Sequence, residues 1–319
     1  MAAIALVGFL DQNGMPPNGI VLTAVLPGGC PLACPFCIVA ARDERSEQSW
    51  LTPDHLTAAL NTVAAEGLLS AVAIVGDEPL QSNAWPYAES VLDAASKLGL
   101  PMALITNGFE LVDYVDRLRR YIGIKLVVSV DGVGVHHDEL RGRAGAFDRM
   151  RIGLRAALRV PDLRQNLTVA TTVVPHNLDR LGELLQFVAD EGVRRWVLSP
   201  MLMAGSSLRI HPKVEQRIGR KIADLQELPK ASGIELSLGD EFALLKPWHG
   251  MLSDAGVHVL SPRKHPNLIR IDALGRMETL RTFESGHTTG LALSQKLSNV
   301  GRSVVSLVNQ EFGYLKSVA

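Results

Sequence analysis

The sequence has few cysteines, no excess of charge of either sign and no long apolar run, and each absence excludes a class of protein. Three cysteines in 319 residues cannot form a disulfide framework. A formal net charge of -1 gives no electrostatic footprint for nucleic acid or anionic lipid. The apolar residues 1–10 lack a basic segment and are too short to span a bilayer. We therefore expect a cytoplasmic protein with reduced thiols and with neither a membrane nor a nucleic acid as partner.

A helix–glycine–strand unit recurs through the first two thirds of the chain. In each unit, apolar residues at helical spacing end at a glycine, and these glycines are Gly67, Gly99, Gly123 and Gly192. Glycine suits the end of a helix because it tolerates a positive φ. Each glycine precedes a run that is apolar throughout, as in parallel strands covered on both faces. These runs are Ala71–Val75, Met102–Ile105, Ile124–Val130 and Trp196–Leu198.

Two further runs, Ile20–Leu26 and Leu167–Val174, bring the number of predicted strands to six. Strand–helix alternation with right-handed crossovers gives a parallel sheet or barrel, and eight units are needed to close a TIM barrel. We predict an α/β fold, a partial (β/α)6 barrel over residues 19–205. An N-terminal segment, residues 1–18, precedes the barrel. A small α+β extension, residues 206–319, follows it.

The predicted extension has a different rhythm. Residues 211–229 indicate a polar helix, and residues 291–316 a second helix. Short strands are expected at Ile234–Leu238, Leu268–Asp272 and Met277–Leu280, the last two joined as a hairpin.

All three cysteines lie directly after the first predicted strand. Cys30, Cys34 and Cys37 are spaced C-x3-C-x2-C, and chemistry in βα barrels sits at the carboxyl ends of strands. Three thiolates can hold three corners of a [4Fe–4S] cluster and leave the fourth iron open. Phe36 would shield such a cluster from water. Zinc with a histidine as fourth ligand, or three inert thiols, are the alternatives, although the nearest downstream histidine, His55, lies inside a predicted helix.

The cysteine spacing resembles that of the radical S-adenosylmethionine (radical SAM) superfamily. Three further segments match the family's motifs in order and at strand ends. Residues 76–79 read Gly-Asp-Glu-Pro and resemble its Gly-Gly-Glu-Pro motif, residues 106–108 read Thr-Asn-Gly, and residues 129–132 read Ser-Val-Asp-Gly. Residues 141–142, 171–177 and 198–200 fit the same pattern, so that the resemblance covers about residues 19–205.

The resemblance implies a chemistry. SAM would chelate the open iron of a single [4Fe–4S] cluster on the three cysteines. Electrons from an external donor such as flavodoxin or ferredoxin would drive its cleavage to a 5′-deoxyadenosyl radical, which takes a hydrogen from a substrate. The residues implied in cofactor binding are Phe36, Gly76, Asp77, Glu78, Pro79, Thr106, Asn107, Ser129, Asp131, Arg141, Thr172, Leu198 and Pro200.

The resemblance also suggests a role for some of these residues. The backbone carbonyls of residues 76–79 would meet the SAM amino group, and Arg141 its carboxylate. Asn107, Ser129 and Asp131 are candidates for the ribose and methionine moieties. Asp77 replaces the family's second glycine, and its extra carboxylate beside a negatively charged cluster has no explanation in the sequence. Two neighbouring histidines, residues 136 and 137, are expected in an exposed turn or against substrate.

No cysteine follows Cys37, although residues 268–290 resemble the hairpin of an auxiliary-cluster (SPASM/twitch-like) domain. We interpret the C-terminal third as a cysteine-free form of that domain that covers the substrate. This disfavours molybdopterin-precursor cyclases and sulfatase-maturation enzymes, which need extra clusters. Its candidate substrate contacts are His249, Arg270, Glu278, Arg281 and His287.

The sequence leaves three functions open, two of them enzymatic. A small polar metabolite, such as a nucleotide or sugar, is the first expectation. About twenty residues precede the first strand, whereas peptide-modifying relatives often carry an extra leader-binding domain. Modification of a ribosomally made peptide is the alternative. The third is a metal-binding protein without catalytic activity, which would not need the SAM motifs.

Overall fold

The computed structural model describes residues 20–37 and 52–201 and, in the C-terminal third, residues 217, 219–221, 224, 233–238, 258–259, 267–271 and 277–279. Their strands are β1 (Ile20–Leu26), β2 (Leu69–Gly76), β3 (Met102–Thr106), β4 (Lys125–Ser129), β5 (Leu167–Val173), β6 (Arg195–Pro200), β7 (Glu235–Leu238), β8 (His258–Val259), β9 (Asn267–Ile271) and β10 (Met277–Thr279). They form one ten-stranded sheet in the order β10-β9-β1-β2-β3-β4-β5-β6-β7-β8.

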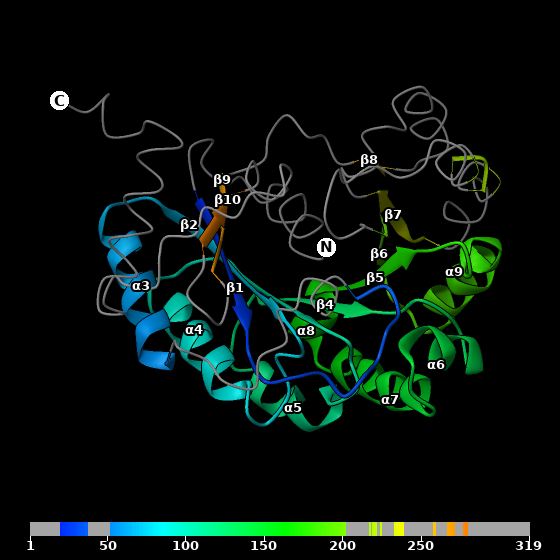
Figure 1. Ribbon diagram of the computed structural model, residues 1–319, viewed down its shortest axis with the longest axis horizontal. Helices are drawn as coiled ribbons and strands as arrows, with labels where there is room; N and C mark the ends of the chain where they lie inside the picture. Colours follow the sequence, from blue (N-terminus) through cyan, green and yellow to red (C-terminus); the bar gives the residue numbers. More distant parts are fainter. Residues whose placement is uncertain are drawn as a thin grey trace.

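The helices alternate with the strands and form an arc around the outside of the sheet (Figure 1). They are α3 (Pro53–Ala65), α4 (Trp85–Lys97), α5 (Leu111–Leu118), α6 (Val135–Arg141), α7 (Ala146–Leu158), α8 (Pro161–Asn166), the 3-10 turn η1 (Leu178–Arg180) and α9 (Leu181–Asp190). Gly67, Gly99, Gly123 and Gly192 all adopt a positive φ, between 64° and 75°. The predicted helix–glycine–strand units are therefore confirmed.

The pairing of the strands confirms the predicted α/β partial barrel. Strands β1 to β6 pair with their sequence neighbours, and all five ladders are parallel. Because the strands are parallel, their carboxyl ends meet at one edge of the sheet. The loops that follow β1, β2, β3 and β4 carry the cysteines and the three motif segments, so the fold gathers these at that edge.

The core lies on both faces of the sheet. The larger cluster combines strand residues such as Leu22 and Ile74 with the inner sides of the helices. The smaller cluster contains strand residues only, and its buried members are Val21, Ala71, Ala73, Ala103, Ile105 and Val127. Since alternate residues of a strand face opposite ways, this second cluster lies on the face away from the helices. Three of its six members are alanine, so this face is lined with small side chains.

The described strands of the C-terminal third belong to the same sheet. Strands β7 and β8 extend it beyond β6 in parallel, and β9 pairs in parallel with β1 at the other side. The predicted strand over residues 234–238 and the predicted hairpin are confirmed as β7 and the antiparallel pair β9–β10. The sequence did not predict β8, which has two residues.

Other predictions for this part of the chain stay predictions. Within 211–229, the described residues 217, 219–221 and 224 are helical, while the hairpin turn and the helix over 291–316 lie outside the described residues. The predicted domain boundary near residue 205 also lies outside the described residues. No helix in the described part of the chain has both the length and the apolarity needed to cross a bilayer.

Candidate active site

The three cysteines lie on the loop after β1, partly exposed and not bridged to one another. The amide of Cys37 donates to the carbonyl of Cys34 at 3.2 Å, which folds the loop into a turn. Burial raises the pKa of the Cys30 thiol to about 12 and also raises that of Cys34. Because the thiolate is the form that binds metal, loading this site must release protons.

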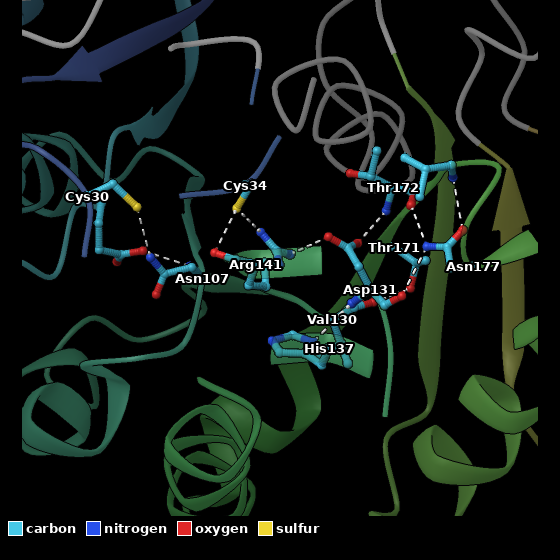
Figure 2. Close-up of polar contacts among 12 residues, drawn as sticks. Cys30, Cys34, Asn107, Val130, Asp131, His137, Arg141, Thr171, Thr172 and Asn177 are labelled. Carbon is cyan, nitrogen blue, oxygen red and sulfur yellow. Dashed lines mark hydrogen bonds and ion pairs between the residues drawn. The ribbon is translucent and has the colours of Figure 1, made fainter. Parts of the chain in front are cut away.

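Two side chains donate hydrogen bonds to these sulfurs (Figure 2). Asn107 Nδ2 lies 3.4 Å from Cys30 Sγ, and Arg141 Nη1 lies 3.7 Å from Cys34 Sγ. Both donors come from other parts of the fold: Asn107 directly follows β3, and Arg141 is the last residue of the helix α6. The sulfurs are therefore placed among N–H groups, which favour the negative charge of thiolates.

Glu78 ties the loop after β2 to the end of β3. Its carboxylate accepts hydrogen bonds from Thr106 Oγ1 at 2.6 Å, from the amide of Asn107 at 2.7 Å and from the amide of Leu80 at 3.1 Å. The side chain is 1% exposed, and burial raises its pKa to about 7, against the opposite effect of these donors. Glu78 therefore fixes the backbone of residues 76–79 and the direction of Asn107.

The structure explains the carboxylate that the sequence left unexplained. Asp77 Oδ2 accepts a hydrogen bond from the amide of Gly29 at 3.1 Å, next to Cys30. Asp77 therefore ties the cysteine loop to the loop after β2. Beside it, Gly76 has a φ of 136°, and a Cβ there would lie 2.5 Å from the carbonyl oxygen of Leu26. Only glycine lets the ends of β1 and β2 approach this closely.

A buried ion pair connects the cysteine loop with the ends of β4 and β5. Arg141 Nη2 lies 2.8 Å from Asp131 Oδ2, and the two side chains are 10% and 0% exposed. Asp131 Oδ1 accepts from the amide of Thr172 at 2.7 Å, and its carbonyl from Asn177 Nδ2 at 3.0 Å. Burial raises the pKa of Asp131, and the nearby positive charge of Arg141 partly opposes this effect. Burial alone would lower the pKa of Arg141, but the negative charges of Asp131 and Cys34 outweigh burial, so that the pKa of Arg141 is raised.

The turn that ends α6 packs directly against the cysteine loop. The carbonyl of Arg141 accepts from the amide of Ala33 at 2.9 Å. Gly142, with a φ of 65°, passes so close that a Cβ would lie 2.5 Å from the carbonyl oxygen of Ala33. Arg143 Nη1 donates to the carbonyl of Pro31 at 2.9 Å. Three successive residues thus hold the chain between Cys30 and Cys34.

A sequence profile of a known family matches the part of the chain that forms this site. The Radical SAM superfamily profile matches residues 25–188, more than half of the chain. The chain belongs to the radical SAM superfamily. Its matched region includes the three cysteines and the segments after β2, β3 and β4.

Curated relatives share this region. A pre-heme d1 synthase of Dinoroseobacter shibae is 31% identical over 183 residues, which is 55% of this chain and 42% of the relative. The PqqA peptide cyclase of Ruegeria pomeroyi is 27% identical over 186 residues, 56% of this chain and 46% of the relative. The alignments thus span less than half the length of either relative.

A solved structure shares the fold over most of the chain. The crystal structure of Streptococcus suis SuiB bound to S-adenosylmethionine has a TM-score of 0.59 at 17% identity. It covers 92% of this chain and 67% of the SuiB chain. At this identity the likeness shows a common fold.

Radical SAM enzymes use an iron–sulfur cluster and SAM, and the residues present fit both groups. The cluster needs sulfur ligands at separate corners, and the loop offers three thiols with N–H donors at two of them. Among the described residues, no three His, Cys, Asp or Glu side chains converge as they would around a single metal ion. For SAM, the buried Nε of Arg141 has no hydrogen-bond partner within the described residues, so its N–H can donate a hydrogen bond to a carboxylate.

The structure places the remaining predicted residues in different surroundings. Thr106, Asn107, Asp131 and Thr172 all join the polar network at the strand ends. Ser129 is the last residue of β4 and pairs with Ala170 of β5. Phe36 is partly exposed beside Cys37, and Pro79 lies in the loop that Glu78 braces.

Two predicted residues come from β6. The backbone of Pro200 pairs with Val173. Leu198 is fully buried in the larger core cluster, so its side chain packs between sheet and helices.

The expectation of exposed turn histidines is wrong for His137. It lies on α6, is fully buried, and its Nδ1 accepts from the amide of Asp131 at 3.4 Å. Burial lowers its pKa to about 3, so the ring is neutral. His137 therefore supports the segment that carries Asp131. The only sequence signal for this role is the position of His137 on a short helix, one residue before Asp138 and four residues before Arg141.

Proposed function

We propose that this radical SAM enzyme holds a single [4Fe–4S] cluster on Cys30, Cys34 and Cys37 and cleaves SAM reductively to take hydrogen from a small polar metabolite. The observation that carries the proposal is that all three cysteines of the sequence lie on one loop, at the sheet edge where the motif segments meet. When bound, cluster and SAM supply the one-electron chemistry, with electrons from a donor such as flavodoxin or ferredoxin.

The chain's own residues bind and orient the cofactor. The braced backbone of residues 76–79 offers carbonyls to the SAM amino group, and Arg141 Nε offers an N–H to its carboxylate. Ser129, Asp131 and Thr172 lie at or beside the adjacent strand ends, where they would meet the ribose and methionine moieties of SAM. The side chain of Leu198 does not face the cofactor, because it lies in the core between sheet and helices.

Anaerobic reconstitution tests the cluster and the reaction together. We expect about four irons and four sulfides per chain, and 5′-deoxyadenosine when the reduced protein is incubated with SAM. A Cys37→Ala variant is the control and should form no product above background. About eight irons, or one zinc without sulfide, would contradict the single cluster, and no product above the control would contradict SAM cleavage.

Modification of a peptide is the second candidate, favoured by the name of the PqqA peptide cyclase, just as the name of the pre-heme d1 synthase favours a metabolite. To distinguish the two substrate classes, an extract of the cells from which the protein comes is added to the enzyme, and the increase in 5′-deoxyadenosine formation is measured. We expect the stimulating material to pass a 3 kDa filter and to survive protease treatment. Loss of stimulation after protease treatment would support the peptide instead.

A further inference from the structure

We propose that Asn107 and Arg141 set the reduction potential of the cluster by donating hydrogen bonds to two of its three cysteine sulfurs, and that Asp131 is the positioning residue that aims Arg141. This inference rests on the cluster of the proposed function and does not depend on the identity of the substrate. Figure 2 shows the two donors beside Cys30 and Cys34, with Asp131 on the far side of Arg141.

Asn107 is held so that its NH2 group faces the sulfur. Its Oδ1 accepts from the amide of Phe109 at 2.8 Å, which leaves Nδ2 on the side of Cys30. Its own amide donates to Glu78 at 2.7 Å, so the backbone is fixed as well. Because the oxygen must face the amide of Phe109, the opposite orientation of the Asn107 side chain would lose both bonds.

Arg141 brings a full positive charge to Cys34. Its guanidinium is held from the other side by Asp131, whose second oxygen is itself occupied by the amide of Thr172. The Arg141 and Asp131 side chains are almost completely buried, so water screens the charge little. The fork of the guanidinium lets one side chain reach a carboxylate and a sulfur at once.

These contacts bear on the electron that the cluster must accept. Reduction adds one negative charge from a one-electron reductant, here dithionite, and breaks no bond. Hydrogen bonds to the sulfurs and nearby positive charge stabilise the more negative state, and both are known determinants of cluster potential. Removing either donor should therefore lower the potential and make the cluster harder to reduce.

The test is a potentiometric titration of the reconstituted full chain, followed by electron paramagnetic resonance in the absence of SAM. At the wild-type midpoint, Arg141→Met should lower the ratio of reduced to oxidised cluster about tenfold, a shift of about 59 mV for one electron. Asn107→Ala should lower it about threefold. Arg151→Met and Asn166→Ala are matched controls, because they bond to Glu191 and Asp162 and touch no cysteine.

The outcomes are distinguishable. If Arg141→Met fails to take up iron, Asn107→Ala carries the measurement, with a lowered midpoint again expected. Wild-type midpoints in variants that hold a full complement of iron and sulfide overturn the proposal and leave the proposed function intact. A wild-type chain that takes up no iron and sulfide overturns both.

Discussion

Two buried titratable side chains beside the site respond to pH in opposite directions. The pKa of Glu78 is raised to about 7, so the folded state holds its proton more tightly than the unfolded chain. Its contribution to stability is therefore lost as the pH rises from about 4.5 to about 7. The pKa of His137 is lowered to about 3, so its contribution is present above about pH 6.5 and is lost as the pH falls. Between about pH 4.5 and 6.5 the two effects oppose each other.

Glu78→Gln should remove the part of the pH dependence that comes from Glu78, while the contribution of His137 is the same in both chains and cancels in the comparison. We expect the unfolding free energy of the variant, relative to that of the wild type, to fall on acidification by about 1.4 kcal/mol per pH unit between pH 6.5 and 5. Urea denaturation of the cluster-free chain at several pH values measures this. The variant should also be less stable at neutral pH, by about 1–3 kcal/mol, because one of three donors to Glu78 loses its acceptor.

Glu139→Gln is a suitable control, since Glu139 is exposed and lies on the same helix as His137. The same pH profile in Glu78→Gln and in the wild type would show that Glu78 does not titrate in this range.

For the individual residues of the site, the sequence predicted which ones lie close together but not which atoms each side chain contacts. Cys30 and its partners could be found because they follow strands at a family spacing. The hydrogen bonds to Glu78 could not be found in this way, because two of the three donors are backbone amides that come together only in the folded sheet. The burial of His137 could not either, since a seven-residue helix gives too little periodicity to show which face is buried.

The connection from α6 to α7 is the element that positions the cysteine loop. Besides the contacts of residues 141–143 with that loop, Asp138 caps α7 by accepting from the amides of Gly145 and Phe147, both at 2.7 Å. The loop therefore rests on a connection that is itself tied to a helix end.

Gly142→Ala should prevent cluster loading without unfolding the barrel. A methyl group at this position would collide with the carbonyl of Ala33, between Cys30 and Cys34. The matched control is Gly145→Ala, because Gly145 also has a positive φ, of 76°, but nothing lies within 4 Å of its Cβ position. Both variants carry the backbone strain, and only the first carries the collision.

The measurement is iron and sulfide per chain after anaerobic reconstitution, with far-UV circular dichroism to verify the fold. We expect Gly142→Ala to retain less than about a tenth of the wild-type iron, in line with the loss that disrupted outer-shell partners cause at metal sites. Gly145→Ala should load normally. Equal loading of both variants would show that the contact with Ala33 does not position the ligands.

The helices and strands themselves were predictable because local signals agreed. Apolar residues at a helical period, followed by a glycine, gave both the element and its end. The place of β7 and β9 in the barrel's own sheet was not predictable, because the partner of a strand is a property of the tertiary fold. Strand β8 has two residues, too few for any pattern.

For the molecule as a whole, burial rather than metal should maintain the fold. The buried core includes none of the three cysteines, which are all partly exposed. Cys34→Ala should therefore abolish cluster binding and SAM cleavage but keep the far-UV spectrum and a cooperative thermal transition. Iron analysis and calorimetry measure the two effects. Loss of the cooperative transition would show that the cluster is needed for folding.

The C-terminal hairpin is expected to bear on the substrate. Strand β9 places Arg270 in register with Thr23 of β1 and with Glu278 of β10, while His249, Arg281 and His287 lie outside the described residues. Arg270→Ala should slow substrate turnover several-fold and leave iron content and uncoupled SAM cleavage unchanged, and Arg155→Ala is the control. If the variant instead loses SAM binding, this strand serves the cofactor.

The pairing of β1 with β9 has a consequence for the order in which the chain is synthesised. Strand β1, buried along its whole length, is synthesised before the other described strands, and its partner β9 on one side is synthesised only after β2 to β8. At about 5–20 residues per second, β1 waits on the order of ten to fifty seconds with one row of amides and carbonyls unpaired. Such an edge is a template for pairing with other chains. Slower translation should therefore lower the yield of soluble protein, and a chaperone that shields nascent apolar strands should restore it.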